Sequence, residues 1–390
     1  MARLGEVCDI LNGYAFKSDQ YVGEGIRIIR IANVQKGHIE DSTPVFYPYD
    51  SIDAKKYALE EGDMLISLTG NVGRVAKLSR EFLPAALNQR VACLRIKAGV
   101  SLDRAFLCNL LNSDCFEQQC IAASKGVAQK NMSTEWLKEY DIPMLSIDKQ
   151  KQIAGVLDEV ESMIALRKEQ LAKLDQLVKS RFIELFGDPI SNSLGLNTKP
   201  MTDICEIIDG DRGKNYPTTD DFSDDGYCLF LNAKNVTSDG FNFENCMYIT
   251  EKKDAALRKG RLKRGDVVLT TRGTIGNLAF YTNEIPFERV RINSGMVILR
   301  MKQEVADEVY FIEHFKMQLA DIKAIIASGS AQPQLPISTM NKIQILIPEI
   351  EQQRAFAAFV EQVDKSKFDL KQSLEKLETL KKALMQEYFG

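Results

Sequence analysis

The stretch Gly62–Gly70 reads Gly-Asp-Met-Leu-Ile-Ser-Leu-Thr-Gly, and it decides the fold because a variant of it returns as Gly265–Gly273. The second stretch reads Gly-Asp-Val-Val-Leu-Thr-Thr-Arg-Gly and begins 203 residues after the first. Each combines a Gly-Asp turn signal, a short apolar run that favours a strand, and a closing glycine. Self-similarity at a fixed displacement indicates an internal repeat. The sequence therefore predicts the same structural unit twice.

Further landmarks recur at the same displacement. Ala128-Gln129 returns as Ala331-Gln332, and Phe186-Gly187 returns as Phe389-Gly390. The helical segments keep their apolar pattern, whereas the polar loops differ in residue identity between the copies. This combination predicts one scaffold that reads two different things. Duplex DNA is the commonest ligand with an approximate two-fold symmetry of its own.

The composition is that of a folded protein without a membrane span. At 390 residues, each repeat can bury its own core. No run of about 18 apolar residues occurs, and the first residues lack the pattern of a secretory signal. The cysteines form no Cys-x-x-Cys pair, so we expect a reduced, cytoplasmic protein. A formal net charge of -4 argues against unselective coating of nucleic acid, although basic residues can gather on one face.

Each repeat begins with a mixture of short strand-like runs and turn signals, followed by a helical stretch. In the first copy we expect strands at 26–31, 64–68 and 91–96 and a helix over 103–123. In the second copy we expect strands at 227–231, 266–270 and 296–301 and a helix over 308–327. A mixed α and β domain is therefore predicted in both copies.

Each repeat ends in a long helix with a narrow apolar stripe, whose steps of three and four residues are typical of a coiled coil. Both helices follow an Ile-Pro pair, Ile142-Pro143 and Ile347-Pro348. The predicted stripe of the first helix is Ile153, Leu157, Val160, Ile164, Leu171, Leu174, Val178 and Leu185. That of the second is Phe356, Val360, Val363, Leu370, Leu374, Leu377, Leu384 and Tyr388.

These patterns predict an α+β chain of four segments. Two target domains, at 1–148 and 189–348, would be separated by two long antiparallel coiled-coil helices at 149–188 and 349–390. The repeat would give the chain an internal pseudo-two-fold symmetry. The alternative is that each helix packs on its own globular domain.

No catalytic motif is apparent. The segment Gly210–Asn215 lacks the spacing and the hydroxyl of a phosphate-binding loop. No His-Glu-x-x-His or Gly-x-Ser-x-Gly occurs, nor the Asn-Pro-Pro-Tyr expected of an amino-methylating enzyme. His38 and His314 do not correspond between the copies. We therefore predict no catalytic residue and no metal site.

Polar loops at the strand ends are the candidate DNA-binding elements. Thr69–Arg74 and its counterpart Arg272–Asn277 each contain Gly-x-x-Gly, which lets backbone amides approach phosphates but is also typical of an ordinary hairpin turn. Asn and Gln can pair with adenine, Arg with guanine, and Ser, Thr and Lys with phosphates. The predicted DNA-binding residues are Lys17, Ser18, Thr69, Asn71, Arg74, Asn88, Gln89, Arg90, Lys125, Gln129, Lys130, Asn131, Arg212, Lys214, Asn215, Thr271, Arg272, Thr274, Arg289, Arg291, Asn293, Ser328, Ser330, Gln332 and Gln334.

Over its whole length the chain resembles the specificity subunit of a type I restriction–modification enzyme. The motifs that carry the resemblance are the two Gly-Asp stretches, the Ile-Pro pairs with Lys149–Ile153 and Glu351–Arg354, and the Phe-Gly helix ends. The resemblance implies two target-recognition domains, each of which reads one half of a split double-stranded DNA site. It implies no catalysis and no cofactor of this chain.

The same resemblance implies partners. Two methylase (modification) subunits would use S-adenosylmethionine, and restriction and translocase subunits of a full complex would use ATP. Two other classes stay open: a stand-alone bipartite DNA-binding regulator without enzymatic partners, and a hydrolase or transferase with an unrecognised site.

Overall fold

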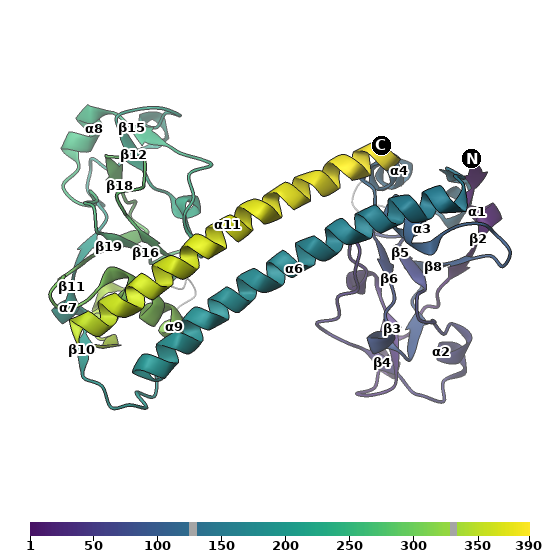
Figure 1. The fold of residues 1–390 in the computed structure, drawn as a ribbon, viewed down its shortest axis with the longest axis horizontal. Coiled ribbons are helices and arrows are strands. Elements are labelled where there is room, and N and C mark those ends of the chain that lie inside the picture. The colour runs from purple at the N-terminus through teal and green to yellow at the C-terminus, as the bar shows by residue number, and fades with distance from the viewer. Residues whose placement is uncertain (125–130, 328–333) are drawn as a thin grey trace. The chain divides into compact units, whose positions relative to one another are not determined.

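The computed structural model describes residues 1–124, 131–327 and 334–390 (Figure 1). It divides into two compact units, Met1–Lys168 with Gln372–Gly390, and Glu169–Lys371. The two long helices, α6 (Ile147–Phe186) and α11 (Ile350–Phe389), both contribute to each unit. Among the described residues, none of the helices is long and apolar enough to cross a membrane.

Among the described residues, the first unit contains two sheets of more than two strands. The antiparallel four-stranded sheet has the order β2 (Cys8–Asn12), β8 (Val91–Ile96), β5 (Met64–Ser67), β6 (Val75–Lys77). The three-stranded sheet has the order β4 (Phe46–Tyr47), β3 (Ile26–Ile29), β7 (Ala85–Leu87), with β3 and β7 parallel. The remaining elements are β1 (Ala2–Arg3), β9 (Asp141–Ile142), α1 (Leu4–Val7), α2 (Ile52–Lys56), α3 (Arg104–Leu111), α4 (Asp114–Ala123) and α5 (Thr134–Glu139).

The second unit repeats this topology. Its four-stranded sheet has the order β11 (Cys205–Asp209), β19 (Met296–Met301), β16 (Val267–Thr270), β17 (Leu278–Phe280). Its three-stranded sheet has the order β15 (Tyr248–Ile249), β12 (Cys228–Phe230), β18 (Val290–Arg291), with β12 and β18 parallel. The remaining elements are β10 (Thr198–Pro200), β13 (Val236–Thr237), β14 (Gly240–Phe241), β20 (Gln344–Leu346), α7 (Met201–Ile204), α8 (Glu251–Ala256), α9 (Glu308–Ala327) and α10 (Ile337–Met340). The predicted mixed α and β fold and its repeat are confirmed.

One inner strand of each four-stranded sheet, β5 or β16, is covered on both faces. In β5, Met64 and Ile66 enter a core formed with α3 and α4, whereas Leu65 enters a second core on the opposite face. In β16, Val267 and Leu269 face one core and Val268 faces the other. Because successive side chains of a strand alternate between faces, a strand buried on both sides reads as an unbroken apolar run. This burial explains the run that follows each Gly-Asp pair.

The predicted helix over 103–123 is two helices. Helix α3 ends before Asn112, and the hydroxyl of Ser113 accepts a hydrogen bond from the backbone N–H of Phe116, at 3.2 Å, to begin α4. A serine whose side chain satisfies a free N–H in this way is a strong start signal for a helix. The counterpart in the second unit, α9, is continuous over Glu308–Ala327, as predicted.

In each unit the start of one long helix packs beside the end of the other. In the first unit, Leu157 of α6 and Phe389 of α11 belong to one apolar core. The ion pairs Glu161–Lys381 and Lys168–Glu378 link the two helices there. The residue numbers increase along α6 while those of their partners decrease along α11, so the helices run in opposite directions. The predicted antiparallel pairing is therefore confirmed. Each long helix packs on the domain that precedes it through its first turns only. Its last turns complete the core of the other unit.

The second unit has the reciprocal arrangement. Phe182 and Phe186 from the end of α6 pack with Phe356 from the start of α11 and with Tyr310 of α9. The predicted stripe placed Leu185 in this seam, but its side chain is exposed. The aromatic rings of Phe182 and Phe186 fill the seam instead, because the helix end meets a globular core as well as the partner helix.

A buried glutamine fastens each long helix to the domain that precedes it. The side-chain carbonyl of Gln150 accepts the backbone N–H of Asp103 at 2.7 Å, and its amide donates to the carbonyl of Leu145 at 2.8 Å. Gln353 makes the matching contacts, from Asp307 N–H at 3.0 Å and to Pro348 O at 2.9 Å. These two residues explain the recurrent glutamine near the start of each helix.

Candidate nucleic-acid interface

The Gly-x-x-Gly loop of each unit is a hairpin turn closed by a side-chain hydroxyl. Ser67 Oγ donates to the carbonyl of Asn71 and accepts the N–H of Arg74 at 3.1 Å. In the second unit Thr270 Oγ1 donates to the carbonyl of Thr274 and accepts the N–H of Asn277 at 2.9 Å. The turn is thus built identically from different residues, which leaves its outer side chains free to differ.

The second glycine of each turn serves packing. A Cβ on Gly73 would lie 2.8 Å from the Cβ of Cys120, and one on Gly276 would lie 2.1 Å from a methyl carbon of Leu319. Gly273, the first glycine of its turn, has open space around it and a φ of +72°. Packing therefore explains why the second position is glycine. At the first glycine the backbone is open to the approach of a ligand.

Hydrogen bonds join this turn to other predicted loops of the first unit. The N–H of Leu68 donates to the carbonyl of Arg90 at 3.0 Å, and the N–H of Met132 donates to the carbonyl of Leu68 at 2.8 Å. Gln89 N–H in turn donates to the carbonyl of Tyr14 at 2.9 Å. Three loops therefore meet at one edge, and the fourth, with Lys17 and Ser18, follows directly from Tyr14.

The second unit builds the corresponding edge. The N–H of Thr271 donates to the carbonyl of Gly295 at 2.8 Å, and the N–H of Leu335 donates to the carbonyl of Thr271 at 2.9 Å. The Arg212 guanidinium donates to the carbonyl of Ser294 at 3.2 Å. We call this gathering the four-loop edge: 14–18, 69–74, 88–90 and 131 in the first unit, and 210–215, 272–277, 289–295 and 334 in the second.

Most of the predicted residues that the structure describes present side chains at this edge. Those that are exposed are Lys17, Ser18, Asn71, Gln89, Arg90, Asn131, Arg212, Lys214, Asn215, Arg272, Thr274, Arg289 and Gln334. Those that are half-buried are Thr69, Arg74, Asn88 and Asn293. Lys125, Gln129, Lys130, Ser328, Ser330 and Gln332 lie outside the described residues.

Several of these side chains are held in place. The Arg74 guanidinium donates to the side-chain carbonyl of Gln35, and Arg289 lies over the ring of Tyr227, with 4.4 Å from its guanidinium carbon to the ring centre. Asn293 accepts the N–H of Gly295 at 2.8 Å. Polar groups fixed in this way lose less side-chain entropy when they bind a ligand.

Two predicted residues must be corrected. Arg291 is only 4% exposed, and its guanidinium pairs with the buried carboxylate of Asp254 and donates to the carbonyl of Leu257 at 3.2 Å. Thr271 is also buried, and its hydroxyl donates to the carbonyl of Gly295 at 3.0 Å. Both side chains stabilise the fold and are not available to DNA.

His314 has a structural role. Its Nε2 accepts the backbone N–H of Leu346 at 3.0 Å, and burial lowers its pKa to about 3. Within the ranges that the structure describes, no three His, Cys, Asp or Glu side chains gather as metal ligands would. The polar groups of the four-loop edge are hydrogen-bonding groups of the kinds that recognise polar ligands.

The sequence matches one family of known proteins in each comparison. A sequence profile described as "Type I restriction modification DNA specificity domain" matches residues 1–176 and 195–382. The type I restriction enzyme EcoAI specificity subunit of Escherichia coli is 34% identical over 163 residues, which is 40% of this chain and 27% of that protein. This match therefore spans about a quarter of the EcoAI subunit. The EcoBI specificity subunit of E. coli is 21% identical over 387 residues, covering 92% of this chain and 78% of that protein.

A solved structure shares the fold. The crystal structure of the type I restriction–modification system S subunit from M. genitalium aligns with 100% of this chain and 95% of its own, with a TM-score of 0.60. The sequence identity is 16%, so this similarity concerns the fold alone.

Proposed function

The chain belongs to the type I restriction–modification DNA specificity domain family, and from this premise we propose that it recognises a split double-stranded DNA site, with one half read by each unit. The observation that carries the proposal is the four-loop edge: in both units the same two backbone hydrogen bonds join the turn to the two loops beside it, while the side chains differ. A shared scaffold with divergent polar loops is suited to two different half-sites. Arginine, asparagine and glutamine are the side chains that most often pair with base edges.

Within each edge we propose a division of labour. Gln89, Arg90 and Asn131 of the first unit, and Arg272 and Gln334 of the second, are exposed side chains of the types that read bases. The hydroxyl and lysine side chains of the same loops, Ser18 and Lys17 among them, suit phosphates and set the register on the duplex. Removal of a base-reading side chain should then affect one position of the site, whereas removal of a phosphate-binding one should weaken all sequences alike.

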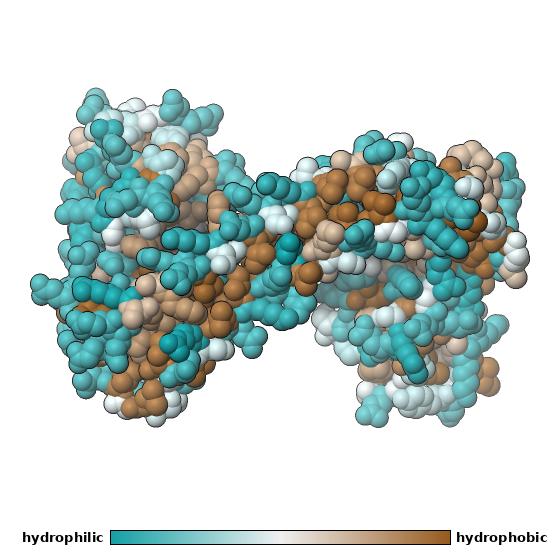
Figure 2. All heavy atoms as spheres, in the orientation of Figure 1, coloured by the Kyte–Doolittle hydropathy of each residue, from teal (hydrophilic) through white to brown (hydrophobic). Residues whose placement is uncertain are grey.

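We further propose that two methylase subunits dock on the long helices and carry the chemistry, with S-adenosylmethionine bound to them. In a full complex, restriction and translocase subunits would consume ATP. Exposed apolar side chains on the helices support docking: Met163 and Leu166 in the first unit, Leu177 and Phe368 in the second. On the face seen in Figure 2, apolar residues lie among polar ones over the helix segments of each unit. A partner would also supply positive charge that a chain of net charge -4 lacks.

Co-expression with its methylase, followed by mapping of methylated bases, tests this function. The expected result is a methylated motif with two specified halves and an unspecified spacer. Replacement of residues 1–146 by the first domain of a relative should change one half and leave the other. If both halves changed, the units would not be independent readers. Tight, selective binding by the purified chain alone at physiological salt would favour the stand-alone regulator.

A further inference from the structure

The second domain carries a basic segment at a place where the first domain is shorter. In the first unit, seven residues lie between the helix cap Ser51 and the buried Leu59; in the second, eleven lie between the cap Thr250 and the buried Leu262. The two caps act alike, since each hydroxyl accepts the N–H three residues on, at 3.2 Å. The longer connection therefore holds four additional residues.

These additional residues bring in positive charge. Arg258 and Lys259 lie in the longer connection. Arg261 occupies the position that Ala58 has in the first unit, because Arg261 bridges to Arg291 of β18 as Ala58 bridges to Ala86 of β7. All three side chains are exposed. The first unit instead carries negative charge in this region, at Glu60 and Glu61, which directly follow Leu59.

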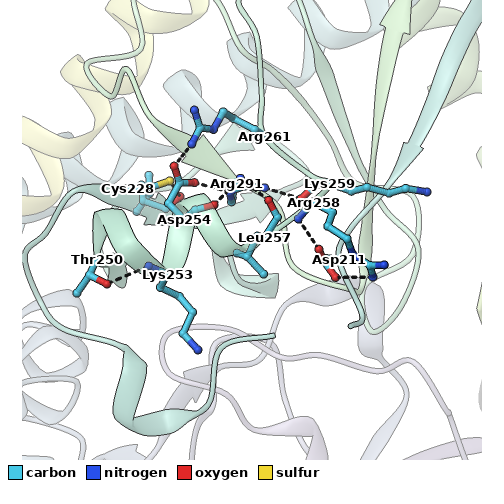
Figure 3. Close-up of polar contacts among 11 residues, drawn as sticks. Asp211, Cys228, Thr250, Lys253, Asp254, Leu257, Arg258, Lys259, Arg261 and Arg291 are labelled. Carbon is cyan, nitrogen blue, oxygen red and sulfur yellow. Dashed lines mark hydrogen bonds and ion pairs between the residues drawn. The ribbon is translucent and has the colours of Figure 1, made fainter. Parts of the chain in front are cut away.

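A buried carboxylate fixes one of the three cations. Asp254 is 1% exposed and pairs with both Arg291 and Arg261 (Figure 3). The buried Arg291 already neutralises this carboxylate and also donates to the carbonyl of Lys259 at 2.6 Å. The guanidinium of Arg261, whose side chain is 51% exposed, is therefore oriented by Asp254 while its charge stays in excess.

A second buried carboxylate joins the segment to the four-loop edge. Asp211 accepts the N–H of Gly213 at 2.8 Å and the N–H of Arg258 at 2.7 Å. Its oxygen also lies 3.4 Å from the guanidinium of Arg258, whose side chain is 75% exposed (Figure 3). Asn215 adds a hydrogen bond to the carbonyl of Ala256 at 3.1 Å. The segment thus lies directly beside the loop that carries Arg212 and Lys214.

We propose that Arg258, Lys259 and Arg261 form a phosphate-binding ridge that is particular to the second domain, and that they contact the DNA backbone beside the half-site which this domain reads. The proposal rests on the function proposed above. Phosphates rather than bases are the expected partners, because the three cations follow one another on a single connection outside the four loops. Cations that neutralise phosphates release counterions and give affinity without sequence preference. The second domain would then hold DNA more firmly than the first.

The test uses the full chain in complex with its methylase. Binding of two duplexes, one with the mapped motif and one scrambled, is measured by anisotropy over a series of salt concentrations. The triple variant Arg258→Gln, Lys259→Gln, Arg261→Gln should weaken binding to both duplexes by the same factor. The slope of log affinity against log salt should become shallower by about one for each phosphate that is no longer neutralised. The double variant Arg258→Lys, Arg261→Lys should bind almost as well as the parent, because phosphates accept either cation.

The double variant Lys55→Gln, Lys56→Gln removes exposed cations from helix α2 of the first domain and is compared with Arg258→Gln, Lys259→Gln. It should change the slope less. An equal change from both pairs, an unchanged slope in the triple variant, or a loss confined to one base position would each overturn the ridge. If the parent complex itself did not distinguish the duplexes, the proposed function would fail instead. Thermal melting serves as the control for folding. The variants are expected to fold, because Asp254 keeps its ion pair with Arg291 and Asp211 keeps its two backbone donors.

Discussion

Phe389 packs edge-to-face against Phe106, with ring centres 5.5 Å apart. Its counterpart in the repeat, Phe186, packs in the same way against Tyr310, with ring centres 5.1 Å apart. The end of the second long helix therefore belongs to the core of the first unit, and the end of the first long helix belongs to the core of the second. The two repeats exchange their last helical turns.

This exchange predicts that a chain ending at Gly187 forms a dimer. Without residues 372–390 the first unit loses Leu384, Tyr388 and Phe389 from its core. Because Phe186 is the repeat counterpart of Phe389, the helix end of a second copy can fill the vacancy, and Lys168 can pair with Asp175 of that copy as it does with Glu378 here. The same exchange in both directions closes a two-fold dimer. Sedimentation of residues 1–187 is expected to show a dimer, and a stable monomer would refute the exchange.

Truncation of the Phe389 ring should destabilise the first unit. Phe389→Ala removes a buried aromatic side chain, and we expect a loss of about 3–5 kcal/mol in the free energy of unfolding. The matched control is Phe368→Ala on the same helix, where the side chain is 61% exposed and the expected change is within about 0.5 kcal/mol. Urea unfolding followed by circular dichroism provides both values. Equal effects would contradict the structural role of the helix end.

Replacement of Gln150 should loosen the start of α6. Gln150→Leu keeps the volume but leaves the N–H of Asp103 and the carbonyl of Leu145 without their partner. Each unpartnered buried group costs about 1–3 kcal/mol, so we expect a loss of at least about 2 kcal/mol. The control is Gln152→Leu, an exposed position two residues away. Hydrogen exchange at the amide of Asp103 should accelerate in the first variant only; protection that survived would show that the glutamine is dispensable.

His314 should make stability depend on pH. Burial lowers its pKa to about 3 from an ordinary value of 6.5, so the unfolded chain binds a proton that the folded chain excludes. The contribution of neutral His314 is complete above about pH 6.5 and is lost as the pH falls from there toward 3, with a slope of up to about 1.4 kcal/mol per pH unit. In His314→Gln this part of the dependence should vanish. The free energy of unfolding of both proteins is compared at pH 7 and pH 5. An equal loss of stability in the parent and the variant would contradict a role for His314.

The sequence predicted the inner strands of each domain, β3, β5 and β8 in the first, because their cause is local, but it did not predict the edge strands. The three residues after each Gly-Asp pair are all apolar, and burial on both faces of β5 and β16 requires that pattern. The long helices were equally predictable from their period. The break between α3 and α4 was missed although Ser113 is a strong cap, because the apolar pattern continues across it.

Other features depend on residues that are distant in the chain. Arg291 looked like an exposed base reader, and only Asp254, 37 positions earlier, makes it a buried structural residue. Phe182 and Phe186 replace Leu185 in the helix seam because Tyr310 of α9 lies there. The basic run 258–264 was a readable signal for the ridge, but its position beside Arg212 depends on Asp211. The assignment of individual loop residues to bases or phosphates stays a prediction.

The exchanged helix ends also bear on how the protein is made. During translation the first domain emerges early, yet its core lacks Phe389 and its neighbours until the ribosome has added about 200 more residues. At synthesis rates of about 5–20 residues per second, that delay is roughly 10–40 s. For this interval the nascent first domain exposes an apolar surface that chaperones can bind, and a second nascent chain on the same messenger can offer Phe186 to it. Polysome density is therefore a variable that should govern the yield of correctly closed monomer.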